Sequence, residues 1–289
     1  FMPVQTTIGM ELAADGRTGA RLGQMNAVRN MAMIVGAGLV FFGFKYLHFT
    51  YKFNFILTVV VLVFAAALML LMSPQKVELS HSFLKLRKEY GIFYMLAMLS
   101  GSRKQLFITF APWVIVTIFH KPTQTIATLL VIGGVIGIVF QPFLGRAIDR
   151  FGEKTIITIE AITFIFVCLG YGFSGSLFPE NTAFIITCAC YLLDQVLMSV
   201  SMARSTYIKK IALQPMDIQP ALSASVTIDH IFSISVALLG GVIWSKLGYQ
   251  YVFLLGVIIS VFNFITARKM RLPAVHTPSA VAVIDTPTI

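Results

Sequence analysis

The chain has 289 residues, of which 57% are hydrophobic and 12% charged, and its formal net charge is +10. Soluble domains contain about 45–50% apolar and about 25% charged residues, so this composition excludes a soluble enzyme and an intrinsically disordered protein. In such an apolar chain, excess Lys and Arg is typical of the cytoplasmic flanks of membrane spans and argues against a nucleic-acid partner. The composition therefore predicts an integral membrane protein.

Apolar segments of the roughly 20 residues needed to cross a bilayer follow one another along the chain. Pro, Gly and charged residues separate them, and they predict eight transmembrane helices, at 25–44, 54–73, 91–119, 124–144, 155–174, 182–203, 221–244 and 250–268. Because a bilayer excludes unpaired backbone groups, we expect an all-α, polytopic helical bundle. These spans leave no room for a soluble catalytic domain between them.

The basic residues are distributed unevenly over the connections between these spans. Of the 22 Lys and Arg, 16 fall on one side: Arg17, Arg21, Arg29, Lys76, Lys85, Arg87, Lys88, Arg146, Arg150, Lys154, Arg204, Lys209, Lys210, Arg268, Lys269 and Arg271. Only 4 fall on the other side, namely Lys45, Lys52, Lys121 and Lys246. Basic residues favour the cytoplasmic side, which predicts a multi-pass protein of the plasma membrane with both ends of the chain in the cytoplasm.

The longest internal connection, 74–90, divides the spans into two plus six. It alternates Lys and Arg with Leu and Phe, which indicates a cytoplasmic amphipathic segment. We therefore expect the end of one bundle at 1–73, a cytoplasmic connecting segment at 74–90 and a six-helix bundle at 91–270. The Thr-, Pro-, Ala- and Val-rich stretch 271–289 is expected to be a disordered cytoplasmic tail.

A charged loop follows the fourth span and reads Gly-Arg-Ala-Ile-Asp-Arg-Phe-Gly-Glu-Lys over 145–154. It resembles the G-x-x-x-D-R-x-G-[RK]-[RK] signature of the major facilitator superfamily, with Glu153 where the family usually has a basic residue. The resemblance implies a loop that latches one conformational state through Gly145, Asp149, Arg150, Gly152 and Lys154. Glycine permits close helix approach and tight turns, and a carboxylate between arginines can cap a helix end.

The resemblance also implies an arrangement of spans. Family members have twelve spans as six plus six, and the signature often recurs between the eighth and ninth. The present loop follows the second span of the six-helix block, so the chain resembles spans five to twelve of a bacterial-type member. The segment 11–29 resembles the loop from the fourth span into the fifth. On this interpretation the first four helices are absent, which agrees with a start at Phe1.

The function implied is secondary active transport of a small solute by alternating access, with proton coupling as the default. The resemblance further implies a bacterial inner-membrane location and a monomer when full length. A self-contained eight-span channel, or a membrane scaffold without active transport, stays open as an alternative. An intramembrane enzyme is disfavoured because the 5 His residues are scattered. No motif has the spacing of a metal site, and no cofactor is expected.

Ionisable side chains at bilayer depth are costly, which makes each of them a functional candidate. Span 91–119 carries Arg103, Lys104 and Gln105 between a Gly and a Pro that could bend the helix, and span 182–203 carries Asp194 and Gln195. The resemblance places both spans along the central cavity. We expect Asp194 to pair with Arg103 or Lys104, in contact with substrate or coupling ion or as a structural ion pair.

Span 221–244 carries Asp229 and His230, a carboxylate beside an imidazole that could relay protons. In the family this helix lies between the two halves, so a structural interlock with the signature loop is the preferred interpretation. Glu160 is expected to be shallow and to belong to the charge cluster of Asp149 and Arg150.

Small residues predict where helices approach closely. They occur on the first predicted span at Gly36, Gly38 and Gly43, and on the fourth at Gly133, Gly134 and Gly137. The resemblance implies that these two spans pack together across the halves.

Overall fold

The computed structural model describes residues 2–14, 16–46, 50–70 and 87–271. In these ranges the chain is helical throughout, with helices α1 Met2–Glu11, α2 Thr18–Tyr46, α3 Tyr51–Leu70, α4 Gly91–Thr117, α5 Thr123–Phe151, α6 Glu153–Leu177, α7 Glu180–Leu197, α8 Ser201–Ile211, α9 Ile218–Leu247 and α10 Tyr249–Arg268. Three short 3-10 helices complete it, η1 Lys88–Tyr90, η2 Met198–Val200 and η3 Pro215–Asp217. Most of the connecting segment 74–90 and nearly all of the tail 271–289 lie outside the described residues.

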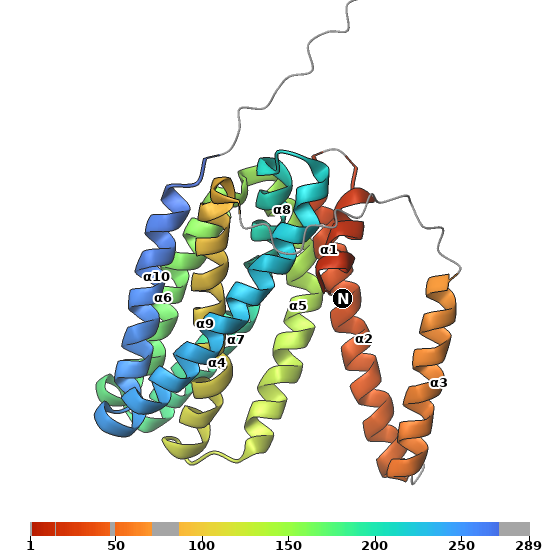
Figure 1. Ribbon diagram of the computed structural model, residues 1–289. Helices are drawn as coiled ribbons and strands as arrows, with labels where there is room; N and C mark the ends of the chain where they lie inside the picture. Colours follow the sequence, from red (N-terminus) through yellow and green to blue (C-terminus); the bar gives the residue numbers. More distant parts are fainter. Residues whose placement is uncertain (1, 15, 47–49, 71–86, 272–289) are drawn as a thin grey trace, which may run out of the picture.

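Helices α4 to α10 pack into one bundle, as Figure 1 shows. Helix α2 runs along α5 at the side of this bundle, and α3 lies beyond α2 at the edge of the molecule (Figure 1). Residues 55–68 of α3 are all exposed although they are almost entirely apolar. Apolar side chains in such numbers are stable on a surface that faces lipid, as a membrane protein requires.

Five helical segments within the described residues are long and apolar enough to cross a membrane: Thr123–Phe151, Glu153–Leu177, Glu180–Ile211, Pro215–Leu247 and Tyr249–Arg268. They coincide with the last five predicted spans. The other three predicted spans fall mainly on the helices α2, α3 and α4, and within the described residues α3 contains the shorter apolar stretch Phe55–Leu68. The predicted number of eight spans therefore stays a prediction.

Three local features differ from the sequence-based expectation. Helix α2 begins at Thr18, so only the first part of 11–29 is a loop, and α1 precedes it without having been expected. Helix α4 is continuous past Gly101 and Pro112, since a proline removes one backbone hydrogen bond without necessarily ending a helix that its neighbours support. The helical segment that contains the predicted span 182–203 continues from α7 into α8, ends at Ile211 and is interrupted by the 3-10 turn η2.

Two single glycines join consecutive helices. Gly152 connects α5 to α6 with a φ of 82°, and Gly248 connects α9 to α10 with a φ of 106°. Left-handed backbone at such positions carries a steric cost for every residue that has a Cβ. Gly152 of the signature loop is therefore required, because it is the single residue that forms the turn between the long helices α5 and α6.

Small residues bring α2 and α5 together, but they differ from those expected on α2. A Cβ atom on Gly145 would overlap the carbonyl oxygen of Gly19, and one on Gly23 would overlap that of Gln141. Gly36 and Gly38 have no atom within 4 Å of such a Cβ. The predicted pairing of the two helices is correct, whereas the close approach at Gly19 and Gly23 lies about four to five helical turns before Gly36, toward the start of α2.

Two apolar clusters fill the bundle. One includes Phe93, Ile157 and Tyr207 and lies toward the end that carries the signature loop. The other includes Phe107, Phe164 and Phe253 and lies toward the opposite end. On α6, Glu160 lies between residues of the two clusters, and on α4, Arg103 and Lys104 lie between Leu99 and Leu106 of the second cluster. These charged residues belong to the candidate site.

Candidate functional site

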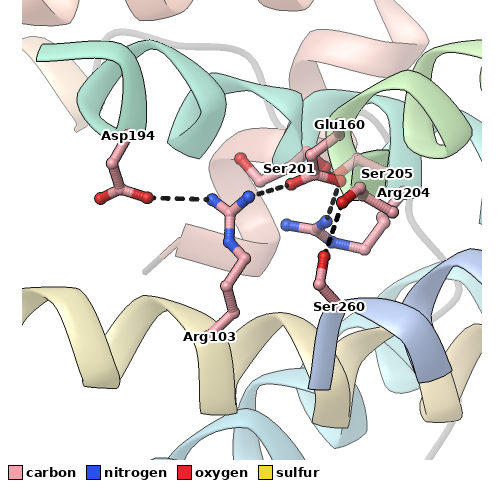
Figure 2. A network of polar contacts seen from close by, with 8 residues as sticks. Arg103, Glu160, Asp194, Ser201, Arg204, Ser205 and Ser260 are labelled. Carbon is pink, nitrogen blue, oxygen red and sulfur yellow. Dashed lines mark hydrogen bonds and ion pairs between the residues drawn. The ribbon is translucent and has the colours of Figure 1, made fainter. Parts of the chain in front are cut away.

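Arg103 is the centre of a buried charge network, shown in Figure 2. Its guanidinium donates a hydrogen bond from Nη1 to Glu160 Oε1 at 2.8 Å. Its Nη2 lies 3.8 Å from Asp194 Oδ1, within ion-pair distance but beyond hydrogen-bonding distance. The three residues come from α4, α6 and α7 and are only 3%, 1% and 2% exposed for Arg103, Glu160 and Asp194.

The second arginine of the network is Arg204 on α8. Its Nη1 lies 3.5 Å from Glu160 Oε2, so each oxygen of this carboxylate faces a different guanidinium. The Phe164 ring lies on Arg103, with 4.6 Å between the guanidinium carbon and the ring centroid. Two cations and two anions thus balance, which is how charges can be buried at an acceptable free energy.

Asp194 is the less completely paired of the two carboxylates. Its Oδ1 is buried and accepts no hydrogen bond from the described residues. Asp194 also lines a cavity of about 200 Å³, here named the Asp194 cavity, together with Gln195 and Pro112. A buried carboxylate oxygen with spare acceptor capacity, beside an open space, can exchange a proton or contact a bound solute.

Arg103 lines a second and larger space, here named the Arg103 cavity, of about 500 Å³. Its polar lining comes mainly from α1, α2, α4, α8 and α9 and consists of Thr6, Arg29, Ser100, Arg103, Lys104, Ser201, Arg204, Ser205, Ser225, Asp229 and His230. Met198 in the 3-10 turn η2 lines both cavities. The ion pair between Arg103 and Asp194 therefore lies between the two cavities, since Arg103 lines the larger one and Asp194 lines the smaller one.

Lys104 and Asp229 form the second ion pair of the site, between α4 and α9. The helices approach closely here because Gly101 has no side chain where Asp229 lies against it, and Ser233 Oγ donates to the Gly101 carbonyl at 3.0 Å. Asp229 thus contacts α4 and not the signature loop, so the expected interlock with that loop is wrong. Its exposed neighbour His230 lines the Arg103 cavity.

The remaining two predicted site residues have separate positions. Gln195 lines the Asp194 cavity, and its side chain packs against Gly133 of α5. Gln105 donates to Thr109 Oγ1 of its own helix at 2.9 Å and lines neither cavity. The structure therefore brings together six of the seven predicted polar residues, in two ion pairs and at two cavities.

The expected shallow position of Glu160 is wrong. It is buried between Arg103 and Arg204, and not in the surface cluster of Asp149 and Arg150. The signal that could have identified it is its position seven residues after Glu153, which puts both carboxylates on one helical face, with only the first near the helix end. Arg204 was likewise assigned to the cytoplasmic flank alone.

The signature loop connects the side helix α2 to the bundle. Asp149, in the last turn of α5, accepts hydrogen bonds from the backbone N–H groups of Gly19 and Ala20, each at 2.7 Å. These groups belong to the first turn of α2, where a carboxylate satisfies unpaired donors and complements the helix dipole. The closely packed backbones of Gly145 and Gly19 permit this contact.

The other residues of the loop make contacts with the end of the bundle. Arg150 is exposed and lies over the Phe151 ring, and Lys154 Nζ donates to the Met270 carbonyl at 3.3 Å. Glu153 is buried and pairs with Lys210 of α8 at 2.8 Å. The residue that departs from the family pattern thus provides a carboxylate for a lysine of a neighbouring helix.

A protein-family model described as the Major Facilitator Superfamily matches the chain twice, over residues 1–213 and 93–285. The two matches overlap between 93 and 213, and together they extend over almost the entire chain. No curated protein matches it.

Proposed function

Because the chain belongs to the Major Facilitator Superfamily, a family of membrane transporters, we propose that it carries a small solute by alternating access coupled to protons. The observation that supports this proposal most directly is the buried Arg103, which faces carboxylates from two different helices at the junction of two cavities. The proposal takes the eight predicted spans as membrane-crossing, both described ends as cytoplasmic and the protein as a monomer of the bacterial inner membrane. It also keeps the predicted division at 74–90, with bundles at 1–73 and 91–270, and the absence of catalytic activity.

In this proposal Asp194 carries the coupling proton. A proton on Asp194 Oδ1 removes the negative charge that attracts Arg103, which then interacts with Glu160 alone. The guanidinium can shift without losing its counter-ion, because the Glu160 bond is already the shorter one. Loss of the proton restores the attraction and draws α4 and α7 together, so protonation is linked to the relative position of two helices.

The substrate is proposed to bind in the Arg103 cavity. Lys104 and Asp229, with His230 and several serines, provide donors and acceptors there, and its volume of about 500 Å³ suits a small solute. The signature loop is proposed to latch the state in which α2 and α5 are docked, through the hydrogen bonds that Asp149 of α5 accepts from the first turn of α2.

The experiment uses the protein expressed from its complete gene and reconstituted into liposomes that contain the pH dye pyranine. A panel of sugars, amino acids, organic acids and organic cations is added, and a transported solute moves protons with it. Asp194→Asn should abolish this coupled movement because the amide cannot carry the proton. Glu180→Gln, an exposed change on the same helix, should leave it intact.

Wild-type proton movement in Asp194→Asn would reject the role of Asp194. Flux that does not saturate with solute concentration and conducts ions would reject the transporter itself and favour the channel alternative.

A further inference from the structure

A third cavity, of about 560 Å³, lies where the first turns of α2 meet the last turns of α5. It is lined by four arginines, Arg17, Arg21, Arg146 and Arg150, and we name it the arginine cavity. It is separate from the Arg103 and Asp194 cavities, with which it shares no lining residue. Its volume falls within the range of about 300–1,000 Å³ that is usual for small-molecule sites.

The four arginines form two pairs with a spacing of four residues. Arg17 immediately precedes α2 and accepts a hydrogen bond at its carbonyl from the backbone N–H of Arg21, one turn on, and Arg146 and Arg150 lie on one face at the end of α5. Residues four apart on a helix are neighbours, and like charges at this spacing repel each other. Two repelling pairs turned toward one cavity concentrate positive charge in it.

The described lining contains one negative charge against these four positive charges. Asp149 is the single carboxylate among the residues that line the arginine cavity, and both its oxygens already accept N–H groups of Gly19 and Ala20. None of the four guanidiniums forms an ion pair with a carboxylate in the part of the chain that the structure describes. Gln24 adds a neutral polar group to the lining.

Such an arrangement fits a phosphate group. Guanidiniums bind phosphate oxygens through paired, charge-assisted hydrogen bonds, and the start of a helix adds a favourable dipole. The exposed Leu12, also in the lining, gives the cavity an apolar edge. Basic pockets between transmembrane helices on the cytoplasmic side are typical sites of anionic lipid headgroups, and the charge distribution of the chain puts this end on that side.

We propose that the arginine cavity binds a phosphate group, held jointly by the basic pairs of α2 and α5. A phosphate there compensates the repulsion within each pair and bridges the two helices beside the Asp149 contact. The phosphate belongs either to the headgroup of an anionic lipid or to a free anion, which the experiment distinguishes. Because binding is measured on the purified protein without transport, its outcome is independent of the proposed function.

The test is native mass spectrometry and thermal unfolding of the purified, delipidated protein in detergent. The probes are phosphatidylglycerol, phosphatidylcholine, glycerol 3-phosphate and inorganic phosphate. The variant is Arg21→Gln with Arg146→Gln, which removes one cation from each helix. The matched control is Arg268→Gln with Lys269→Gln, two exposed cations at the end of α10 that lie outside the cavity.

Phosphatidylglycerol should bind wild type and control alike and bind the cavity variant about 25-fold more weakly, since each arginine near an anionic headgroup contributes roughly fivefold. Phosphatidylcholine should bind none of them selectively. If glycerol 3-phosphate or inorganic phosphate stabilises the protein as well as the lipid does, with the same loss in the cavity variant, the ligand is a free phosphate and the site still stands.

Equal weakening in the cavity variant and the control, or the absence of selective binding of phosphatidylglycerol, glycerol 3-phosphate and inorganic phosphate alike, would overturn the proposal. Unfolding midpoints without ligand identify a variant that is merely less stable. In that case the single variants Arg21→Gln and Arg146→Gln are measured instead, and each should bind phosphatidylglycerol about fivefold more weakly than wild type.

Discussion

At the scale of single residues, the site depends on how two carboxylates share one arginine. Glu160 has a short hydrogen bond to Arg103 and a second arginine on its other oxygen, whereas Asp194 has Arg103 alone and at a longer distance. Glu160 therefore interacts with both buried arginines, and Asp194, with its single and longer contact, is the carboxylate that we propose carries the coupling proton. The two carboxylates differ in role because of their neighbours and not because of their chemistry.

Glu160→Gln should destabilise the protein strongly. The amide retains the shape but removes the negative charge between Arg103 and Arg204, and an uncompensated buried charge costs about 3–5 kcal/mol. Thermal unfolding in detergent measures the effect, with the exposed Glu89→Gln as the control. Equal unfolding midpoints for the two variants would show that the network does not contribute to stability.

At the scale of elements, the contact between α2 and α5 is made by backbone against backbone. Gly19 and Gly23 of α2 meet Gly145 and Gln141 of α5, and Asp149 completes the contact at the first turn of α2. Close packing of this kind is typical of membrane helices, where dispersion replaces the hydrophobic effect as the attraction between helices.

Gly145→Ala should separate the two helices and destabilise the protein, by about 1–3 kcal/mol as for other overpacked sites. Its Cβ would overlap backbone atoms of Gly19, which cannot turn aside as a side chain could. The matched control is Gly36→Ala on α2, where nothing lies within 4 Å, and alanine there should be neutral or stabilising by up to about 1 kcal/mol. Unfolding midpoints that fall equally in both variants would contradict the described contact.

Asp149→Asn should loosen the first turn of α2. An amide provides one acceptor oxygen and no charge where the carboxylate now accepts two N–H groups, a loss of about 1 kcal/mol. Hydrogen exchange of the peptide 18–29, followed by mass spectrometry, should become roughly fivefold faster, while exchange in α10 stays unchanged. Unchanged exchange in the 18–29 peptide would show that Asp149 does not protect this turn.

At the scale of the whole molecule, the fold gathers most of the described basic residues at one end (Figure 1). The signature loop, the arginine cavity and the apolar cluster with Tyr207 lie toward one end, and this end carries most of the basic residues of the described chain. The opposite end, with the α6–α7 connection, has few. The predicted topology assigns the first end to the cytoplasm.

Cysteine labelling in intact cells tests this orientation. In a variant whose three native cysteines are replaced by serine, Glu180→Cys should react with a membrane-impermeant maleimide added outside. Arg268→Cys, also at an exposed position but at the other end, should react only after the membrane is permeabilised. The reverse pattern would invert the topology.

The amino-acid sequence alone predicts the membrane environment, the helical class, the position of the last five spans and the signature loop. These properties depend on composition, on the length of apolar runs and on local motifs, all of which are read along the chain. It also indicated Arg103, Lys104, Asp194 and Asp229, because charge inside an apolar run is conspicuous whatever the fold.

The contact partners follow from helix packing: Glu160 lies between two arginines, Asp229 lies against α4, and Gly19 and Gly23 replace Gly36 and Gly38 at the contact with α5. The physical reason is that each helix can rotate about its axis and shift along it without any change in its own hydrophobic pattern. Which side chains meet is fixed by the packing of neighbouring helices, which a single apolar span does not encode.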